Sequence, residues 1–239
     1  MQKIEEYPYC FHTLSNGIRL VHRYTPSIVS HCGLTIGIGS RDEKLSENGT
    51  AHFVEHCLFK GTSERKAYRI LDCIDGVGGE LNAFTTKEET CVYGLYLQQY
   101  HERFLDLLAD IVFHSTFPEQ AIEKEKEVIL DEINSYMDTP SEQIFDDFEY
   151  RLFGNRGLGR MILGTPDKVK AMTRERLQDF VRANYTTDNM VVSTITSIPA
   201  DKWFAMCEKH LGKEPKTERT NKRSSIGIYK PTYKCIDRD

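Results

Sequence analysis

The stretch HFVEHCLFKGT, residues His52–Thr62, places two histidines and a glutamate within five residues. On a helix, His52 and His56 lie one turn apart on the same face, and Glu55 projects near that face. Zinc needs neutral imidazole ligands and, for hydrolysis, an open coordination position with a carboxylate beside it. The order H-x-x-E-H is the reverse of the H-E-x-x-H zinc motif. The stretch therefore predicts a metal-binding helix that still needs a third protein ligand.

A candidate third ligand lies in the segment EQAIEKEKEVILDEINSYM, residues Glu119–Met137. Apolar residues recur in this segment at helical spacing and form one face of the predicted helix, namely Ile122, Ile129, Ile133 and Tyr136. Glu125 and Glu132 are two turns apart and share a stripe beside this face. The competing interpretation is that the two histidines share a helix by chance and that all these glutamates are solvated. The spacing alone leaves both interpretations open.

Composition limits the classes of protein to which the chain can belong. Its 239 residues allow one large domain or two small ones, and an apolar fraction of 39% is enough for a core. The formal charge of −5, with both signs interspersed, argues against a nucleic-acid partner. No apolar run approaches the roughly 18 residues of a membrane helix, and the N-terminus lacks an apolar signal core. Seven cysteines without a C-x-x-C pair predict reduced thiols, and together these features predict a cytoplasmic protein without a membrane partner.

Turn signals and apolar periodicity divide the chain into strands and helices. The predicted strands are 11–14, 18–22, 29–38, 80–86, 90–97 and 190–196. The predicted helices are one that begins at Ala51-His52 with Thr50 near its cap, and 67–74, 100–113, 118–137, 141–152, 173–183 and 200–211. Because strands often follow strands directly, we expect an α+β fold with a mostly antiparallel sheet covered by helices.

The combination of HFVEHCLFKGT with Glu125-x6-Glu132, about 75 residues later, resembles the pitrilysin/insulinase family of inverted zincins. The mitochondrial processing peptidase branch is the most similar. Further matching stretches occur in the same order over about residues 8–213, namely Gly49-Thr50-Ala51, GGELNAFT (78–85), VILDEI (128–133), Leu163-Gly164-Thr165, Asn184-Tyr185 and Asn189-Met190. The resemblance implies one half-repeat of the processing-peptidase-like metallohydrolase fold.

The resemblance also implies roles for individual residues. His52, His56 and Glu132 would bind Zn²⁺, and Glu55 would be the general base. Glu125 would orient a histidine ligand through its second ring nitrogen.

Three further positions match the strand that borders the substrate cleft in this family. At Asn82, Ala83 and Phe84 an extended peptide is expected to add as a strand, held by backbone hydrogen bonds. For Phe84 an ordinary core position is an equally good interpretation. Cys57 points about 100° away from His56 on the helix, so we expect a buried side chain there and not a ligand.

The function implied is that of a zinc-dependent endopeptidase, which hydrolyses peptides or unfolded polypeptide segments with water activated by zinc and Glu55. Family members enclose the substrate between two homologous halves, and the half without zinc supplies an Arg/Tyr pair for the substrate carbonyl. A homologous second half is therefore expected as partner, within the same polypeptide, as a paralogous subunit or in a homodimer. Residues 1–213 would form the zinc-binding peptidase half-domain, 214–225 a charged linker, and 226–239 the start of a second half-domain or an edge strand.

Two other functions compete with this one. A non-catalytic scaffold or partner subunit could share the fold but keep only a vestigial site, and a metal-storing module could use the same ligands. The full set of His52, Glu55, His56 and Glu132 favours a catalytic protein over both, because a storage site needs no carboxylate beside an open coordination position.

Overall fold

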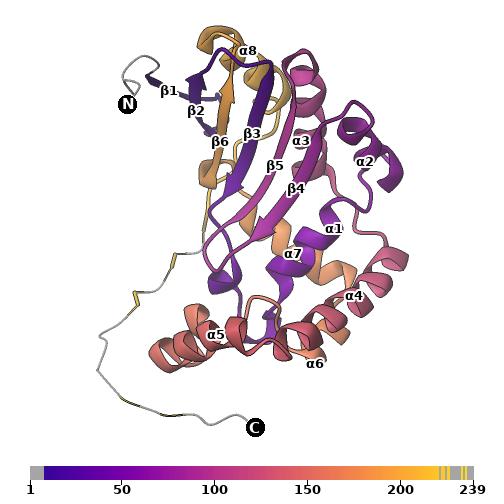
Figure 1. The fold of residues 1–239 in the computed structure, drawn as a ribbon, viewed down its shortest axis with the longest axis vertical. Coiled ribbons are helices and arrows are strands. Elements are labelled where there is room, and N and C mark those ends of the chain that lie inside the picture. The colour runs from indigo at the N-terminus through magenta and orange to yellow at the C-terminus, as the bar shows by residue number, and fades with distance from the viewer. Residues whose placement is uncertain (1–7, 221, 224, 227–232, 234, 236–239) are drawn as a thin grey trace.

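Six segments of alternating apolar and polar residues form one mixed sheet (Figure 1). The computed structural model describes residues 8–220, 222, 223, 225, 226, 233 and 235. The strands are β1 (Tyr9–Thr13), β2 (Arg19–Tyr24), β3 (Val29–Ile36), β4 (Glu80–Thr85), β5 (Thr90–Leu97) and β6 (Met190–Thr196). Their order in the sheet is β1-β2-β6-β3-β5-β4. Neighbouring strands are antiparallel except β2 and β6, which are parallel.

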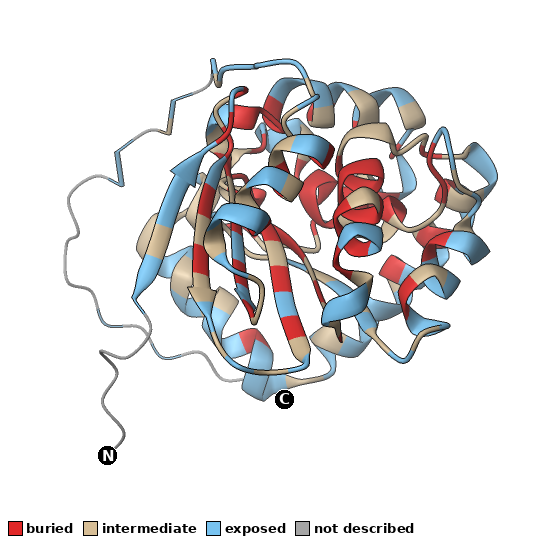
Figure 2. Ribbon diagram, turned by 90° about the horizontal axis from the view of Figure 1, so that it is seen from above, coloured by how far each residue is buried: buried red, intermediate tan, exposed pale blue. Residues whose placement is uncertain are grey.

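The two faces of the sheet differ in burial. Residues of one face are buried under helices, among them Leu20, Cys32, Leu34, Val92, Tyr96 and Val192. Their neighbours in sequence point to the other face, because successive side chains of a strand alternate between faces, and most of these side chains are exposed or half-buried. Figure 2 shows the buried residues concentrated between the sheet and the helices.

The buried face of the sheet packs against helices α2 (Ala67–Asp75), α3 (His101–His114) and α8 (Ala200–His210). Their apolar stripes supply large buried side chains, of which Phe104 stacks on Tyr96 with ring centroids 4.3 Å apart. Trp203 of α8 is also fully buried. This core fixes the sheet and, with it, the position of β4 at its edge.

A second group of helices lies below the sheet in Figure 1, at the end where β4 turns into β5. It consists of α1 (Thr50–Leu58), α4 (Glu119–Met137), α5 (Pro140–Phe153), α6 (Pro166–Lys170) and α7 (Arg174–Asn184). α1 is central, since it contacts β4, α4 and α7. Single turns of 3-10 helix occur at η2 (Ser40–Asp42), η3 (Leu45–Glu47), η4 (Gln98–Tyr100), η5 (Gly157–Gly159) and η6 (Thr187–Asn189).

The structure confirms the predicted α+β class and the mostly antiparallel sheet, although the helices cover only one of its faces. Each predicted strand and helix is present within a few residues of its predicted bounds. Thr50 is the first residue of α1 and not its cap, which is Gly49. Helix α6 was not predicted, because five residues are too few to show a helical period.

The predicted linker 214–225 contains no helix or strand among its described residues, yet several of them bind the domain. The backbone N–H of Thr187 donates to Oγ1 of Thr217 at 2.9 Å. Arg219 and Arg223 both pair with the buried carboxylate of Asp42, at 2.6 and 2.8 Å. The element predicted for 226–239 falls almost entirely outside the described residues. No helix among the described residues is both long and apolar enough to cross a membrane.

Candidate metal centre

Helix α1 is anchored in the protein core by the side chains on the face opposite to its two histidines. Five of its residues are completely buried, namely Ala51, Phe53, Val54, Cys57 and Leu58. Burial raises the pKa of the Cys57 thiol to about 12, so this side chain is a poor metal ligand at neutral pH, as its orientation predicts. With its apolar face fixed in this way, α1 directs His52 and His56 toward α4.

Helix α4 supplies the carboxylates. Ile122, Ile129 and Ile133 are buried, which confirms the apolar face predicted for this helix. Glu125 is buried with them, whereas Glu132 is exposed for 44% of its side chain. Both lie on the side of α4 that meets α1.

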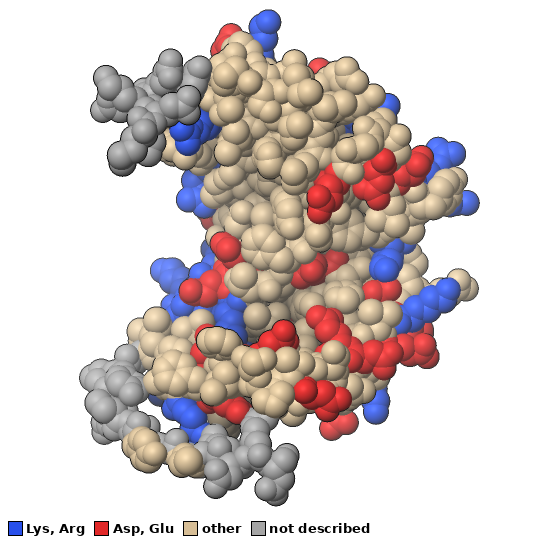
Figure 3. All heavy atoms as spheres, in the orientation of Figure 1, with Lys and Arg blue, Asp and Glu red and all other residues tan. Residues whose placement is uncertain are grey.

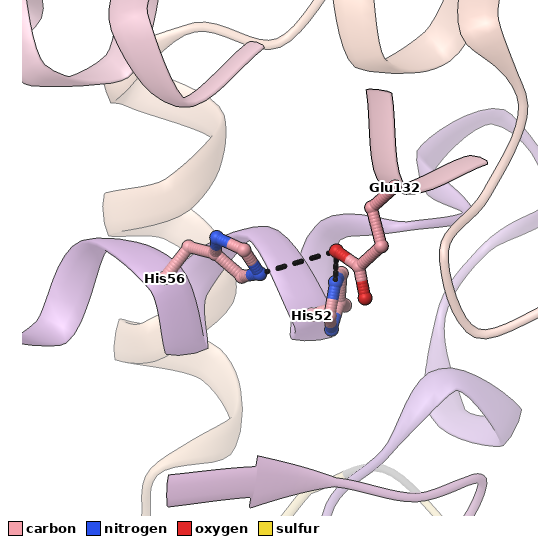
Figure 4. A group of neighbouring side chains, drawn as sticks. All are labelled: His52, His56 and Glu132. Carbon is pink, nitrogen blue, oxygen red and sulfur yellow. Dashed lines mark hydrogen bonds and ion pairs between the residues drawn. The ribbon is translucent and has the colours of Figure 1, made fainter. Parts of the chain in front are cut away.

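The three predicted ligands come together at one point (Figure 4). Oε2 of Glu132 lies 3.1 Å from Nε2 of His52 and 3.5 Å from Nε2 of His56. One ligand atom from each of these residues lies within 4.8 Å of the other two, as it would around a shared ion. Two imidazole nitrogens and one carboxylate oxygen form a typical ligand set of a hydrolytic zinc site.

Glu55 lies beside this group without being part of it. Its Oε2 is 3.7 Å from Nδ1 of His52, which is beyond hydrogen-bond distance, and this buried oxygen has no hydrogen-bond partner among the described residues. A buried carboxylate oxygen without a partner is costly unless a small polar molecule binds it. The residues therefore fit a zinc ion with a water molecule held between it and Glu55.

Glu125 contacts the second ring nitrogen of His56. Its Oε2 is 3.1 Å from Nδ1 of His56, and its Oε1 accepts a bond from Nζ of Lys60 at 2.7 Å. A carboxylate in this place favours the tautomer with a proton on Nδ1, which leaves Nε2 free to bind a metal. This is the geometry that the predicted orienting role of Glu125 requires.

The charges of the site shift each other's pKa values. Burial opposes protonation of His52, but its contacts with Glu132 and Glu55 outweigh burial and raise the pKa of His52 to about 9. Hydrogen bonds from His52 and His56 lower the pKa of Glu132 well below its ordinary value. Burial alone would raise the pKa of Glu55, but His52, Thr85 and His56 lower it below its ordinary value. Without a metal, a protonated His52 therefore pairs with Glu132.

Two hollows flank the group. The smaller, of about 360 Å³, is lined by Glu55, His56, Phe59, Lys60, Ala67, Leu71, Asn82, Ala83 and Glu125. The larger, of about 1030 Å³, includes His52 and Glu132 in its wall and extends along α5 and the turn between β4 and β5. Figure 3 shows a hollow across this face, with Asp and Glu gathered over the helices below it.

The predicted substrate-contacting residues separate into two groups. Asn82 and Ala83 line the smaller hollow beside Glu55 and His56. Phe84 is 41% exposed on the open face of the sheet, with its ring 5.9 Å from that of Tyr93, so the interpretation of Phe84 as a core residue is wrong.

The wall of the larger hollow was not predicted from the sequence. Lys87 lies between the predicted strands 80–86 and 90–97, where the sequence indicates no function, but its Nζ binds Oδ1 of Asp146 at 2.8 Å and pairs with Glu149. The hydroxyl of Tyr136 donates to Oδ2 of the same aspartate at 2.8 Å. These residues lie far apart in the sequence, and no local spacing signals their contact.

Comparison with known proteins gives matches over most of the chain. The sequence model described as "Insulinase (Peptidase family M16)" matches residues 19–166, and "Peptidase M16 inactive domain" matches 171–239. An uncharacterized zinc protease of Mycobacterium leprae is 42% identical over 85% of this chain and 46% of its own length. The mitochondrial-processing peptidase subunit beta of Neurospora crassa is 34% identical over 92% of this chain and 47% of its own length. The chain thus spans about half the length of these curated relatives.

Solved structures share the fold. A protease from Helicobacter pylori superposes with a TM-score of 0.84 at 21% identity, covering 92% of this chain and 54% of that one. The periplasmic protease PqqL from Escherichia coli gives a TM-score of 0.84 at 24% identity, covering 94% of this chain and 26% of that one.

Removal of the Glu125 carboxylate should weaken metal binding. In Glu125→Ala, Nδ1 of His56 loses its acceptor, and zinc affinity should fall by about 10–100-fold, as is usual when such a partner is removed. The measurement is competition with a chromophoric chelator, and Glu127→Ala, an exposed carboxylate of the same helix, is the control. Equal affinities for both variants would contradict the role of Glu125.

Zinc binding should also release protons. Zinc binds neutral imidazole, so below pH 9 the metal must displace the proton of His52, and apparent affinity should rise by about one log unit per pH unit up to about pH 9. Calorimetry at pH 7.5 in two buffers of different ionisation enthalpy measures the number of protons released. Binding without proton release at pH 7.5 would show that His52 is already neutral.

Proposed function

The chain belongs to the insulinase family of peptidases (M16), and we propose that it is the zinc-binding half of an endopeptidase that hydrolyses peptides or unfolded polypeptide segments. One observation carries the proposal. His52, His56 and Glu132 converge on one point, and the unpartnered oxygen of Glu55 lies beside it at the edge of an open cleft. A scaffold protein would have no need of that buried and unsatisfied carboxylate oxygen.

The residues of the site would divide the chemistry among them. Bound by His52, His56 and Glu132, a zinc ion would polarise the scissile carbonyl and acidify a water molecule. Glu55, kept ionised by its surroundings, would accept the proton of that water and return it to the leaving amine. Glu125 would hold His56 in its ligating tautomer.

The edge of the sheet offers a place for the substrate backbone. β4 is the last strand of the sheet, so its outer backbone groups are available to an added strand. Asn82 and Ala83 on this strand line a hollow together with Glu55 and His56, so a peptide paired with β4 would pass the reacting groups. The ring of Phe84 lies on the open sheet face, and we assign substrate contact at this position to the backbone.

The larger hollow favours basic over acidic substrate segments. Six carboxylates line it, namely Glu88, Glu89, Glu132, Glu142, Asp146 and Glu149, against one lysine, Lys87. Such an excess of one charge attracts side chains of the opposite sign, more strongly at low salt.

A second half is the proposed partner. The chain spans about half the length of its relatives, and Glu132 is 44% exposed in this half alone. Next to the cleft, α5 exposes Ile144, Phe145 and Phe148, an apolar group typical of an interaction surface. We propose that a homologous half covers this side, and that residues 1–213 form the zinc-binding unit with 214–225 as connection.

Replacement of Glu55 tests its proposed role as the general base. Glu55→Gln should still bind about one zinc per chain, while kcat falls by about 100- to 10,000-fold, because an amide cannot accept the proton of the water. Metal analysis and turnover of a fluorogenic peptide are measured on the same preparation, with Glu64→Gln, an exposed glutamate, as the control. Turnover within tenfold of the unchanged protein would assign the base to another group.

Addition of a homologous second half tests whether the chain needs a partner for peptide cleavage. Residues 1–239 alone should bind zinc but cleave peptides with a kcat/KM on the order of 100-fold lower than with a homologous half present, because the substrate is poorly oriented by one wall. The assay compares the chain alone with the chain plus that half, in cis or in trans, on one peptide library. Full activity of the chain alone would exclude the need for a partner.

A further inference from the structure

Glu43 is a buried carboxylate placed at the start of the metal-binding helix. It lies in the turn between η2 and η3, and only 6% of its surface is exposed. Its Oε1 accepts a bond from the backbone N–H of Ala51 at 2.7 Å. Its Oε2 accepts bonds from the backbone N–H of Gly49 at 2.9 Å and from Nδ2 of Asn48 at 3.0 Å. Three donors therefore converge on one side chain that precedes the H-x-x-E-H stretch and lies outside the helix.

The residue at the N-cap position of helix α1 has no side chain that could bind the free N–H groups at the start of the helix. The first N–H groups of a helix have no partner within the helix and are usually bound by a Ser, Thr, Asp or Asn side chain at the cap. The cap of α1 is Gly49, at φ +95°, and a Cβ there would lie 2.8 Å from the backbone oxygen of Leu163. A side-chain cap is excluded by this contact, and Glu43 supplies the acceptor and a favourable negative charge from outside the helix.

The helix that Glu43 caps carries three of the four residues of the site. Ala51, whose N–H is bound, immediately precedes His52, and α1 is only nine residues long. The fourth residue, Glu132, stands on another helix, so any rotation or shift of α1 separates the histidines from it. Zinc sites tolerate deviations of only about 0.2 Å in ligand distance.

The backbone of Glu43 and the side chain of Asn48, which binds the carboxylate, connect this helix start to the wall of the cleft. The guanidinium of Arg160 donates to the backbone oxygen of Glu43 at 2.6 Å, and Nδ2 of Asn48 also donates to the backbone oxygen of Met161 at 2.9 Å. Residues 158, 162 and 163 of this loop line the larger hollow. Glu43 thus joins the metal-binding helix to the loop that borders the substrate cleft.

We propose that Glu43 is a positioning residue for the metal centre, which sets the rotation and height of α1 so that His52 and His56 meet Glu132. The inference rests on the proposed zinc-dependent function. Burial raises the pKa of Glu43 to about 7, although Ala51, Asn48, Gly49 and Arg160 act against it. Burial of the negatively charged form of Glu43 therefore costs free energy. The hydrogen bonds of this carboxylate to the start of α1 offset that cost.

The test compares Glu43→Gln with a neighbouring control. Gln has almost the same shape, but its NH₂ group faces donors, so at least one bond to the start of α1 is lost. Zinc affinity, by chelator competition, should fall about tenfold or more. The absorption spectrum of the cobalt-substituted protein should change as well, because it reports ligand geometry. Asp42→Asn removes a buried carboxylate bound to Arg219 and Arg223, and should leave both measurements unchanged.

A second variant and a stability measurement keep the test decisive. Glu43→Asp keeps the charge but is too short to reach Ala51 and Gly49 together, so it should also weaken zinc binding. Thermal unfolding of each variant in excess chelator separates loss of fold from loss of metal. A folded Glu43→Gln or Glu43→Asp with unchanged zinc affinity and cobalt spectrum would overturn the proposal, as would an equal loss in Asp42→Asn. Absence of zinc binding by the unchanged protein would instead overturn the proposed function.

Discussion

The packing of α1 against α4 is the contact on which the site depends, because the ligands come from both helices. Across this contact nitrogen groups and carboxylates alternate in the order Lys60, Glu125, His56, Glu132 and His52. Each carboxylate lies between two nitrogen groups, so the cost of partial burial is offset without a metal. The arrangement uses Nε2 of both histidines, the atoms that would bind zinc. The proposed ligands are therefore already assembled without a metal, and a zinc ion bound there would replace a proton.

Much of this arrangement could be predicted from the sequence because it depends on local spacing. The four-residue interval between His52 and His56 and the seven-residue interval between Glu125 and Glu132 each fix a helix face. The helices and strands carry clear periods and turn signals, so their positions were predicted within a few residues. That the two helix faces meet was implied only by the resemblance to a known family, since neither spacing specifies which elements pack together.

The features that escaped prediction all depend on contacts that no helical or strand period specifies. Thr50 has the residue type of a cap, but Gly49 takes that position because Leu163 lies too close for a side chain. Glu43 resembles any surface glutamate until its three donors are known. Arg219 belongs to a charged stretch that composition assigns to a free linker, yet it binds a carboxylate 177 residues away. Charge and propensity describe such residues, but only the fold supplies their partners.

The topology also shows that residues 19–166, which match the M16 peptidase model, do not form the structural unit around the site by themselves. The match to the M16 peptidase model ends at residue 166, but β6 (190–196) lies in the middle of the sheet, between β2 and β3. Helix α7 (174–184), also beyond the match, packs directly against α1. Among the described residues, β6 joins β1 and β2 to the other three strands, and α7 supports the helix that carries the two histidines. The border between the two sequence matches therefore falls inside one structural unit, and the metal centre depends on residues from both sides of it.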